Sequence, residues 1–297
     1  MRLILKADSW SNAESEFLQP LFEQHFELSH DLDSDGIIYA HWQDWEWARS
    51  LDRPAIIDNL WDPFIQPAIQ DTKNLKVIRS DGWFCIANEC LWYKALGLDE
   101  YKCHIWNRKN FLMLMNYQRP HRDQIWRAIQ PHLSNSLYSY HGVGQKIEGD
   151  LPRVALSSTW QRHLNRDWYD LTKYSLVVET DIQPGTHSEK ILKPCAFGHP
   201  FITWAPAGYL KWLRSWGFET FDNCIDESYD LEQDDDKRLA MVIEEVSRLN
   251  GTMWDYFMDI ETQRRLDVNR KRFYNVEWAH QQFEKYFDTI KQHSNNW

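Results

Sequence analysis

The 297-residue sequence predicts an α/β protein of two lobes, each built on a parallel β-sheet. Short apolar runs rich in β-branched residues alternate with helical patterns along the chain, which is typical of parallel sheets with right-handed crossovers. Several of these runs end at a polar residue followed by a turn signal, as buried parallel strands do. The length suits two domains of about 130 to 150 residues better than one core.

The first lobe is predicted over residues 1–105. Its expected strands are 2–7, 37–42, 54–57 and 76–79, and its expected helices are 13–25, 44–50 and 87–96. His41, Asp44 and Asp58 lie at the ends of two of these strands, where a carboxylate or imidazole can act as a general base. Asp44 equally fits a helix N-cap, and Asp58 fits a cap or a turn. No Gly-x-Gly-x-x-Gly fingerprint is present, so a nicotinamide or flavin enzyme has no positive support.

The second lobe is predicted over residues 106–265, and 266–297 is expected to be a C-terminal helical segment. The strands are expected at 110–116, 137–141, 174–178 and around 201–202, and the helices at 123–129, 160–169, 188–197 and 237–249. Asn116 closes the first of these strands, and Arg119 and Arg122 follow at a helix start. The planar guanidinium fork binds phosphate oxygens in pairs, and the helix dipole disfavours arginines there as plain surface residues.

The stretch from Tyr174 to Lys193 is the centre of the second lobe. A buried strand ends at Glu179, a Pro-Gly turn follows, and Ser188 then fits the N-cap of a helix that begins Glu189-Lys190. In open α/β sheets ligands bind at the carboxyl ends of strands, and a helix start with a nearby lysine is suited to an anion. We therefore expect a phosphate-bearing ligand here. The alternative is that Glu189 and Lys190 are solvated helix charges.

Taken together, these features resemble the donor-binding half of GT-B glycosyltransferases, most closely the fucosyltransferase-like enzymes with bacterial and viral relatives. The likeness covers about residues 110–245. It is carried by the acid at 179, the Ser-Glu-Lys triplet at 188–190, Lys193, the Gly-His-Pro-Phe-Ile run at 198–202 and the acidic segment 225–230, which follows Gly-Phe-Glu-Thr-Phe. The resemblance implies a GT-B fold, with a cleft between two Rossmann-like lobes and a C-terminal helix crossing back to the first lobe.

The same resemblance implies an inverting, metal-independent glycosyltransferase. Such an enzyme moves a sugar from a nucleoside-diphosphate donor, GDP- or UDP-linked, to a hydroxyl of a glycan or another acceptor, and needs no cofactor beyond that co-substrate. The residues implied at the donor are Asn116, Arg119, Arg122, Glu179, Ser188, Glu189, Lys190 and Lys193, and Asp44, Asp58 and His41 are the candidate bases. Asn116 stands one residue closer to the arginines than in the family pattern. The acceptor-lobe motifs of true fucosyltransferases are missing, so fucose is not implied.

Composition narrows the class of protein further. The formal net charge of −11 disfavours a protein that binds nucleic acid through many phosphate contacts. The 17 tryptophans exceed what a core of this size usually absorbs, and their faces can serve as platforms for sugars. Five cysteines without Cys-x-x-Cys spacing fit a reducing compartment. With no signal-peptide core and no apolar run near the roughly 20 residues of a membrane span, we expect a cytoplasmic protein.

Two other functions fit parts of the sequence. A GT-B enzyme could glycosylate hydroxylated bases in phage DNA, holding a flipped base in a tryptophan-lined cleft, although the acidic charge balance argues against it. A catalytically inactive carbohydrate-binding protein would keep the tryptophan platforms and transfer nothing. The intact set of charged residues from Arg119 to Lys193 is the main argument against that reading.

Overall fold

The computed structural model describes residues 1–6, 12–59, 69–80, 82–104, 109–147, 165–252 and 258–295. Within these ranges the chain forms two compact units. The first holds the described residues up to Asn88 and those from Val276 onward, and the second holds the described residues from Glu89 to Asn275. Each unit contains one sheet of parallel strands accompanied by helices, which confirms the predicted α/β class.

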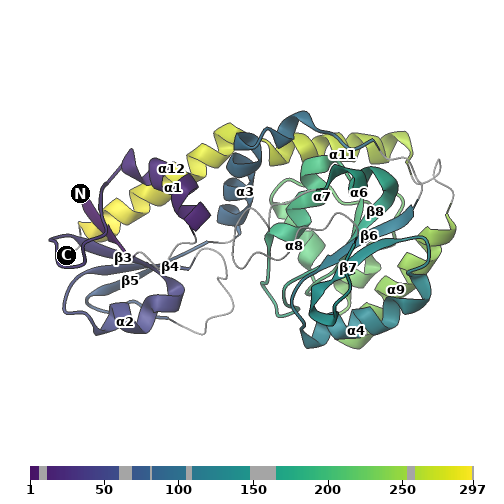
Figure 1. Cartoon of the computed structure of the whole chain (residues 1–297), viewed down its shortest axis with the longest axis horizontal. Helices are drawn as coiled ribbons and strands as arrows, with labels where there is room; N and C mark the ends of the chain where they lie inside the picture. The colour runs from purple at the N-terminus through teal and green to yellow at the C-terminus, as the bar shows by residue number, and fades with distance from the viewer. Residues whose placement is uncertain are drawn as a thin grey trace. The chain divides into compact units, whose positions relative to one another are not determined.

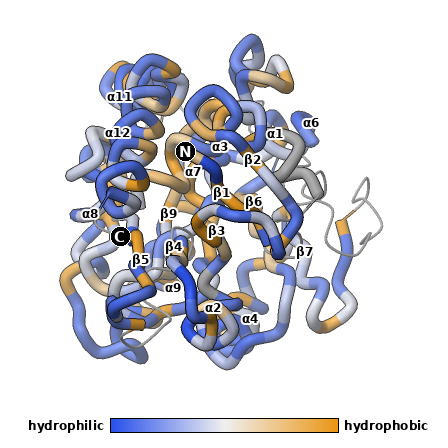
Figure 2. The backbone as a smooth tube through the Cα atoms, turned by 90° about the vertical axis from the view of Figure 1, so that its left-hand side faces the viewer, coloured by the Kyte–Doolittle hydropathy of each residue, from blue (hydrophilic) through white to orange (hydrophobic). Residues whose placement is uncertain are grey.

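The sheet of the first unit has the strand order β2-β1-β3-β4-β5, and every pairing is parallel. Its strands are β1 (Arg2–Leu5), β2 (Glu27–Ser29), β3 (Ile37–His41), β4 (Ala55–Asn59) and β5 (Leu75–Arg79). The helices are α1 (Asn12–Glu23), α2 (Trp45–Ser50), the start of α3 (Trp83–Ala95) and α12 (Val276–Ser294). Figure 2 shows hydrophobic residues on β1 and β3 and mainly hydrophilic ones along α12.

Alternation along β3 gives this sheet two apolar faces. Ile38 and Ala40 pack in a cluster that includes Ala48 of α2, with Trp45 and Trp47 against its border. On the other face, helices α1 and α12 bring aromatic rings over the sheet, and the contacting rings are Phe22, Tyr39, Tyr286 and Phe287. The buried positions of α12, among them Phe283 and Ile290, recur at helical spacing and so form one apolar face. The C-terminal helix packs on the first sheet through this face.

The sheet of the second unit has the order β7-β6-β8-β9 and is also parallel. Its strands are β6 (Lys109–Met115), β7 (Leu137–Tyr140), β8 (Thr172–Val178) and β9 (Phe201–Trp204). Helices α4 (Pro120–Ile129) and α9 (Asp235–Gly251) cover one face, and α6 (Arg166–Leu171), α7 (Leu192–Phe197) and α11 (Ile260–Phe273) lie on the other (Figure 1). Helix α8 (Tyr209–Ser215) follows β9.

The structure divides the chain at different places from the sequence boundaries. The first division falls inside α3 rather than after 105, and the last falls between α11 and α12 rather than at 265/266, which is inside α11. Strand β2 and helix α8 were not predicted. The first part of the helix predicted at 160–169 lies outside the described residues, and α6 begins at Arg166. Among the described helices, none is both long and apolar enough to cross a membrane.

Candidate active site at the strand ends of the second unit

The predicted donor residues gather at the carboxyl ends of the parallel strands in the second unit. Asn116 follows β6 directly, and Glu179 follows β8. The main-chain N–H of Gly142, after β7, donates to the carbonyl of Asn116 at 2.7 Å. Because parallel strands end at a common edge, residues far apart in the sequence meet here, and this is the edge at which open α/β sheets bind ligands.

Glu179 is fully buried, and its carboxylate is saturated by donors from the protein. One oxygen accepts from the main-chain N–H of Ser188 at 3.1 Å and from the hydroxyl of Tyr209 at 2.5 Å. The other accepts from the N–H of Thr180 at 2.8 Å and from the Ser188 hydroxyl. A carboxylate with four such donors and no exposed surface binds the protein itself, not a ligand.

Arg122 is also turned inward, with 2% of its surface exposed. Its guanidinium donates to the main-chain carbonyl of Glu179 from two nitrogens at 3.3 and 3.2 Å, and to the carbonyl of Tyr117 at 3.1 Å. The ring of His121 shares the Glu179 carbonyl, with its Nε2 3.1 Å away. Burial lowers the pKa of Arg122, a sign that its charge has lost much of its water. This arginine fastens α4 to the end of β8.

Lys190 lies at the surface of the same cluster. Its ammonium donates to the Thr180 hydroxyl at 2.7 Å, to the Ser188 hydroxyl at 3.3 Å and to the carboxylate of Glu189 at 3.1 Å. The side chains of Lys190 and Glu189 are 22% and 23% exposed, so both can meet a ligand. Ser188 caps the short helix that begins at Glu189, as the sequence predicts, by accepting from the N–H of Lys190.

The charges around Glu189 are coupled. Burial by itself raises the pKa of the Glu189 carboxyl, but the ammonium groups of Lys190 and then Lys193 outweigh it and hold the pKa at about 2. Lys193, half-buried in the first turn of α7, therefore belongs to the same cluster. At neutral pH this group carries one negative and two positive charges, a net positive charge at the strand edge.

Arg119 differs from Arg122 although both lie at the start of α4. It is exposed and occupies the N-cap position without a side-chain capping bond, and the structure gives its guanidinium no hydrogen-bond or ion-pair partner among the described residues. Two polar atoms of this edge are buried without a hydrogen-bond partner in the described part of the chain, Oδ1 of Asn116 and Oγ1 of Thr186. This edge therefore presents an exposed cation, Arg119, and two buried polar atoms that lack a hydrogen-bond partner among the described residues.

In the first unit, two of the three candidate bases are neighbours. Asp44 stands at the N-cap position of α2 but makes no capping bond there, and it forms an ion pair with Lys6. His41 ends β3, and burial lowers the pKa of its imidazole to about 4, with Asp44 opposing that effect. At neutral pH His41 is therefore a neutral ring able to accept a proton.

Asp58 is placed differently from the prediction. The sequence placed it just after a strand, whereas the structure includes it within β4, where it is 4% exposed and pairs in register with His41. Its carboxylate adjoins the hydroxyls of Tyr39 and Tyr286, which bond to each other. Burial and then the Asp58 charge raise the pKa of Tyr39 well above its usual value. This buried group joins α12 to the sheet.

Two residues of the cluster were not predicted from the sequence. Tyr209 reaches Glu179 from α8, and the hydroxyl of Thr180 accepts from the Lys190 ammonium. Thr180 adjoins Glu179 and could have been found by extending the motif by one position. Tyr209 is 30 residues from Glu179, and no local pattern identifies it.

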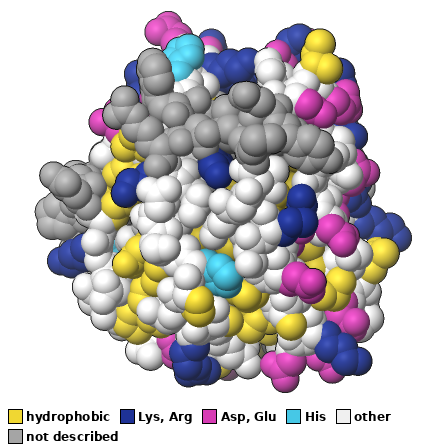
Figure 3. All heavy atoms as spheres, turned by 90° about the vertical axis from the view of Figure 1, so that its right-hand side faces the viewer, with side chains coloured by type: hydrophobic (Ala, Val, Ile, Leu, Met, Phe, Trp, Pro, Cys, Tyr) yellow, Lys and Arg dark blue, Asp and Glu magenta, His cyan; other side chains and the backbone are white. Residues whose placement is uncertain are grey.

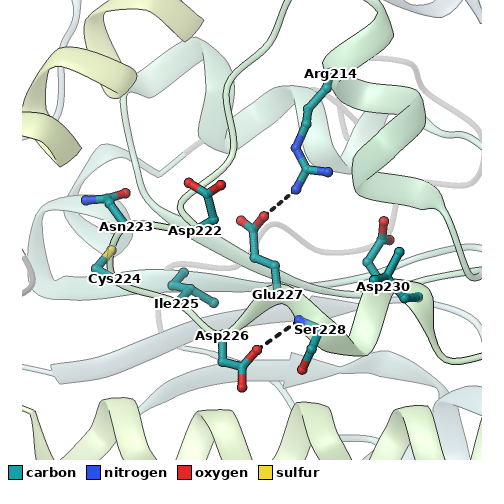
Figure 4. A pocket seen from close by; sticks show the side chains of 10 residues that line it. Arg214, Asp222, Asn223, Cys224, Ile225, Asp226, Glu227, Ser228 and Asp230 are labelled. Atoms are coloured by element: carbon teal, nitrogen blue, oxygen red, sulfur yellow. Dashed lines mark hydrogen bonds and ion pairs between the residues drawn. The ribbon is translucent and has the colours of Figure 1, made fainter.

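A separate pocket of about 530 Å³ lies beside α8, lined by Arg214 and by residues between Asp222 and Leu231 (Figure 4). The acidic segment 225–230 contributes much of this lining, and none of the eight predicted donor residues lines the pocket. Glu227 accepts from Arg214 and from the N–H of Phe221, and Asp230 caps the first N–H groups of α8. The pocket has more carboxylates than its one arginine, so its charge disfavours an anionic ligand.

Basic and acidic side chains are interspersed on the face of the second unit shown in Figure 3. Such a mixed surface differs from the one-sign stripe typical of proteins that track a phosphate backbone.

Among the described residues, no group of three or more His, Cys, Asp or Glu side chains is placed to hold a metal ion. No protein-family model matches the chain, and no curated protein matches it.

Proposed function

We propose that the protein is a GT-B glycosyltransferase that moves a sugar from a nucleoside-diphosphate donor to an acceptor hydroxyl, with inversion and without a metal ion. The acceptor is a glycan in this proposal. The observation that carries it is the positive charge at the carboxyl edge of a parallel sheet, from Lys190 and Lys193 around Glu189 and from Arg119 at the start of α4. A leaving diphosphate needs that kind of charge, preorganised where the negative charge develops.

In this proposal each described side chain of the strand edge has its own role in donor binding. Lys190 and Arg119 are accessible and supply donors to phosphate oxygens, and Lys193 adds positive charge beside them. The carboxylate of Glu189, ionised at neutral pH, accepts from hydroxyls of the ribose or the sugar. Asn116 and Thr186 offer buried polar atoms that lack a partner among the described residues. Glu179 and Arg122 are enclosed and support the site from behind.

The chemical step is a displacement at the anomeric carbon. A base takes the proton of the acceptor hydroxyl, the oxygen forms a bond to the anomeric carbon, and the bond from that carbon to the diphosphate oxygen breaks with its electron pair. Neutralising the departing diphosphate stabilises the transition state. Because lysine and arginine supply this charge, the proposal requires no metal ion.

His41 and Asp44 are the stronger base candidates in the first unit. Asp58 is 4% exposed and adjoins two tyrosine hydroxyls, whereas the Asp44 side chain is 19% exposed. His41 is half-buried and unprotonated at physiological pH, but its pKa of about 4 makes it a weaker base than an exposed histidine. Replacing each in turn and measuring transfer separates them: loss of transfer with intact donor binding identifies the base.

The first experiment is a thermal-shift titration with GDP, UDP, CMP, dTDP and ADP, with and without EDTA. A ligand that binds only the folded state raises Tm. At a ligand concentration of 100 times its Kd, it adds about 2.7 kcal/mol to the free energy of unfolding. Lys190→Ala removes one charge-assisted contact to the phosphate, so its Kd should rise about 10- to 100-fold. Lys237→Ala is the control, because Lys237 is an exposed lysine on α9 whose ammonium makes no hydrogen bond or ion pair with the predicted donor residues in the described part of the chain.

The proposal stands if one diphosphate raises the Tm of the wild type and of the Lys237 variant, both with and without EDTA. The same diphosphate must leave the Tm of the Lys190 variant unchanged. Donor hydrolysis or transfer to a glycan acceptor then completes the assignment. Binding without either reaction supports an inactive relative instead. If no nucleotide shifts Tm, the donor-site assignment is wrong.

A further inference from the structure

We infer that Glu179 is a positioning residue: its buried carboxylate binds the Ser188 hydroxyl and the main-chain N–H of Thr180, and these two residues in turn hold the Lys190 ammonium. The inference assigns Glu179 no contact with a ligand, in contrast to the donor-binding role that the sequence predicts for it. Its consequence for catalysis rests on the proposed function, because Lys190 is the cation proposed to meet the diphosphate. The geometry itself does not depend on the identity of the ligand.

The first step is the direction of the hydrogen bonds. A carboxylate can only accept, so the Ser188 hydroxyl must donate its single proton to Glu179. The lone pairs of that hydroxyl are then turned toward the N–H and the ammonium of Lys190, 3.5 and 3.3 Å away. An un-ionised or missing carboxylate would release the Ser188 proton to point elsewhere, including toward Lys190.

Thr180 provides the second support. Its main-chain N–H is fixed by the Glu179 carboxylate at 2.8 Å, and its hydroxyl accepts from the Lys190 ammonium at 2.7 Å. Two of the three acceptors around Lys190 therefore belong to residues that Glu179 binds, and the third is the neighbouring Glu189. A lysine has four flexible bonds, so fixing its ammonium in advance lowers the entropy lost when it meets a ligand.

Glu179 can hold others because the fold holds it. Its N–H donates to the carbonyl of Trp204 in β9 at 3.0 Å, and its carbonyl accepts from Arg122 and His121 of α4. The Tyr209 hydroxyl ties the carboxylate to α8. These bonds come from three different elements, so the carboxylate has a defined position before any ligand arrives.

The test compares Ser188→Ala with Ser188→Thr. Alanine removes the hydroxyl between Glu179 and Lys190, whereas threonine keeps a hydroxyl at that position. The first readout is the rate at which an N-hydroxysuccinimide ester acylates Lys190 in the absence of nucleotide. Mass spectrometry measures this rate. An ammonium held by three acceptors must break these bonds before the amine reacts, so we expect Ser188→Ala to raise the rate roughly threefold or more. The rate at Lys237 serves as the internal reference.

The second readout is affinity for the diphosphate that stabilises the wild type. We expect binding about tenfold weaker for Ser188→Ala and within about twofold of wild type for Ser188→Thr. Tyr209→Phe removes a donor to Glu179 that does not contact Lys190. It reports the stability cost of loosening the carboxylate while both lysine acceptors remain.

The inference is overturned if Ser188→Ala lowers Tm but leaves the Lys190 acylation rate unchanged, because Glu179 is then only a structural residue. It is also overturned if threonine restores neither readout. The two proposals fail separately. A wild type that binds no diphosphate refutes the donor site, whereas the acylation rates still decide whether Glu179 positions Lys190.

Discussion

Replacing Arg122 and Arg119 separately by methionine distinguishes an arginine that supports the site from one that meets the ligand. The sequence gives both the same role at the diphosphate, and both lie at the start of α4. The structure separates them, since Arg122 is 2% exposed and Arg119 is exposed. Methionine keeps much of the side-chain volume and removes the guanidinium, so packing changes little.

The cost of Arg122→Met follows from its three hydrogen bonds. The carbonyl of Tyr117 loses its bond from the guanidinium, whereas that of Glu179 keeps the bond from His121. An acceptor left without a donor costs about 1–3 kcal/mol when it is buried, and the part-buried carbonyl of Tyr117 and the removal of a partly desolvated charge both reduce this cost. We expect a net loss of about 1–2 kcal/mol, which lowers Tm by roughly 2–8 °C for a unit of this size.

Arg119→Met should behave in the opposite way. An exposed side chain with no partner among the described residues changes stability by about 0.5 kcal/mol or less. Its loss at the phosphate should weaken nucleotide binding about 10- to 100-fold. Thermal unfolding gives the first quantity, and calorimetric titration of the stabilising diphosphate gives the second.

The reasoning is refuted if Arg122→Met keeps the wild-type Tm and abolishes nucleotide binding, because Arg122 would then contact the ligand directly. An Arg119→Met variant with wild-type affinity would remove Arg119 from the donor site.

Three further predictions concern stability. A Cβ at Gly142 would lie 2.6 Å from the main-chain nitrogen of Gln118, so Gly142→Ala should cost about 1–3 kcal/mol in urea unfolding, and an unchanged midpoint would contradict it. Arg270 donates to three main-chain carbonyls, so Arg270→Met should cost about 3 kcal/mol in the same assay, with the exposed neighbour Lys271→Met near zero as control. Burial lowers the pKa of His199 to about 4, below its unfolded value near 6.5, so the unfolded chain binds the proton first. Stability should therefore fall as pH drops from about 6.5 toward 4, and His199→Asn should reduce that slope, with the remainder due to other histidines whose pKa is lowered by burial, such as His41, in unfolding curves recorded across the range.

Local signals in the sequence predicted most of the regular structure. The apolar runs at 110–116 and 174–178 became β6 and β8, and the left-handed Gly198 ends α7 as expected. Such features are readable because backbone preference and the period of apolar residues act over a few neighbours. Helix α8 was not predicted, although Tyr209, Trp212 and Leu213 recur at helical spacing, because a seven-residue helix shows that period only briefly.

The charged residues around the triplet at 188–190 were also found from sequence, since Ser188 caps its helix and Lys190 follows it by local chain geometry. The sequence did not predict which charged side chains remain accessible to a ligand. Arg119 and Arg122 look equivalent in the sequence, and only packing of α4 against β8 encloses the second. Glu179 ends a strand as predicted, but a tyrosine 30 residues away occupies its carboxylate.

The sequence by itself determined the α/β class, the two parallel sheets and the polar residues at the strand ends, because each depends on neighbours along the chain. The tertiary structure alone decided which of those residues are enclosed and which remain accessible, as for Asp58 within β4 and Asp44 beside it in the first unit. Burial and hydrogen-bond saturation are set by partners distant in sequence, and an enclosed polar group must satisfy the protein before it can serve a ligand.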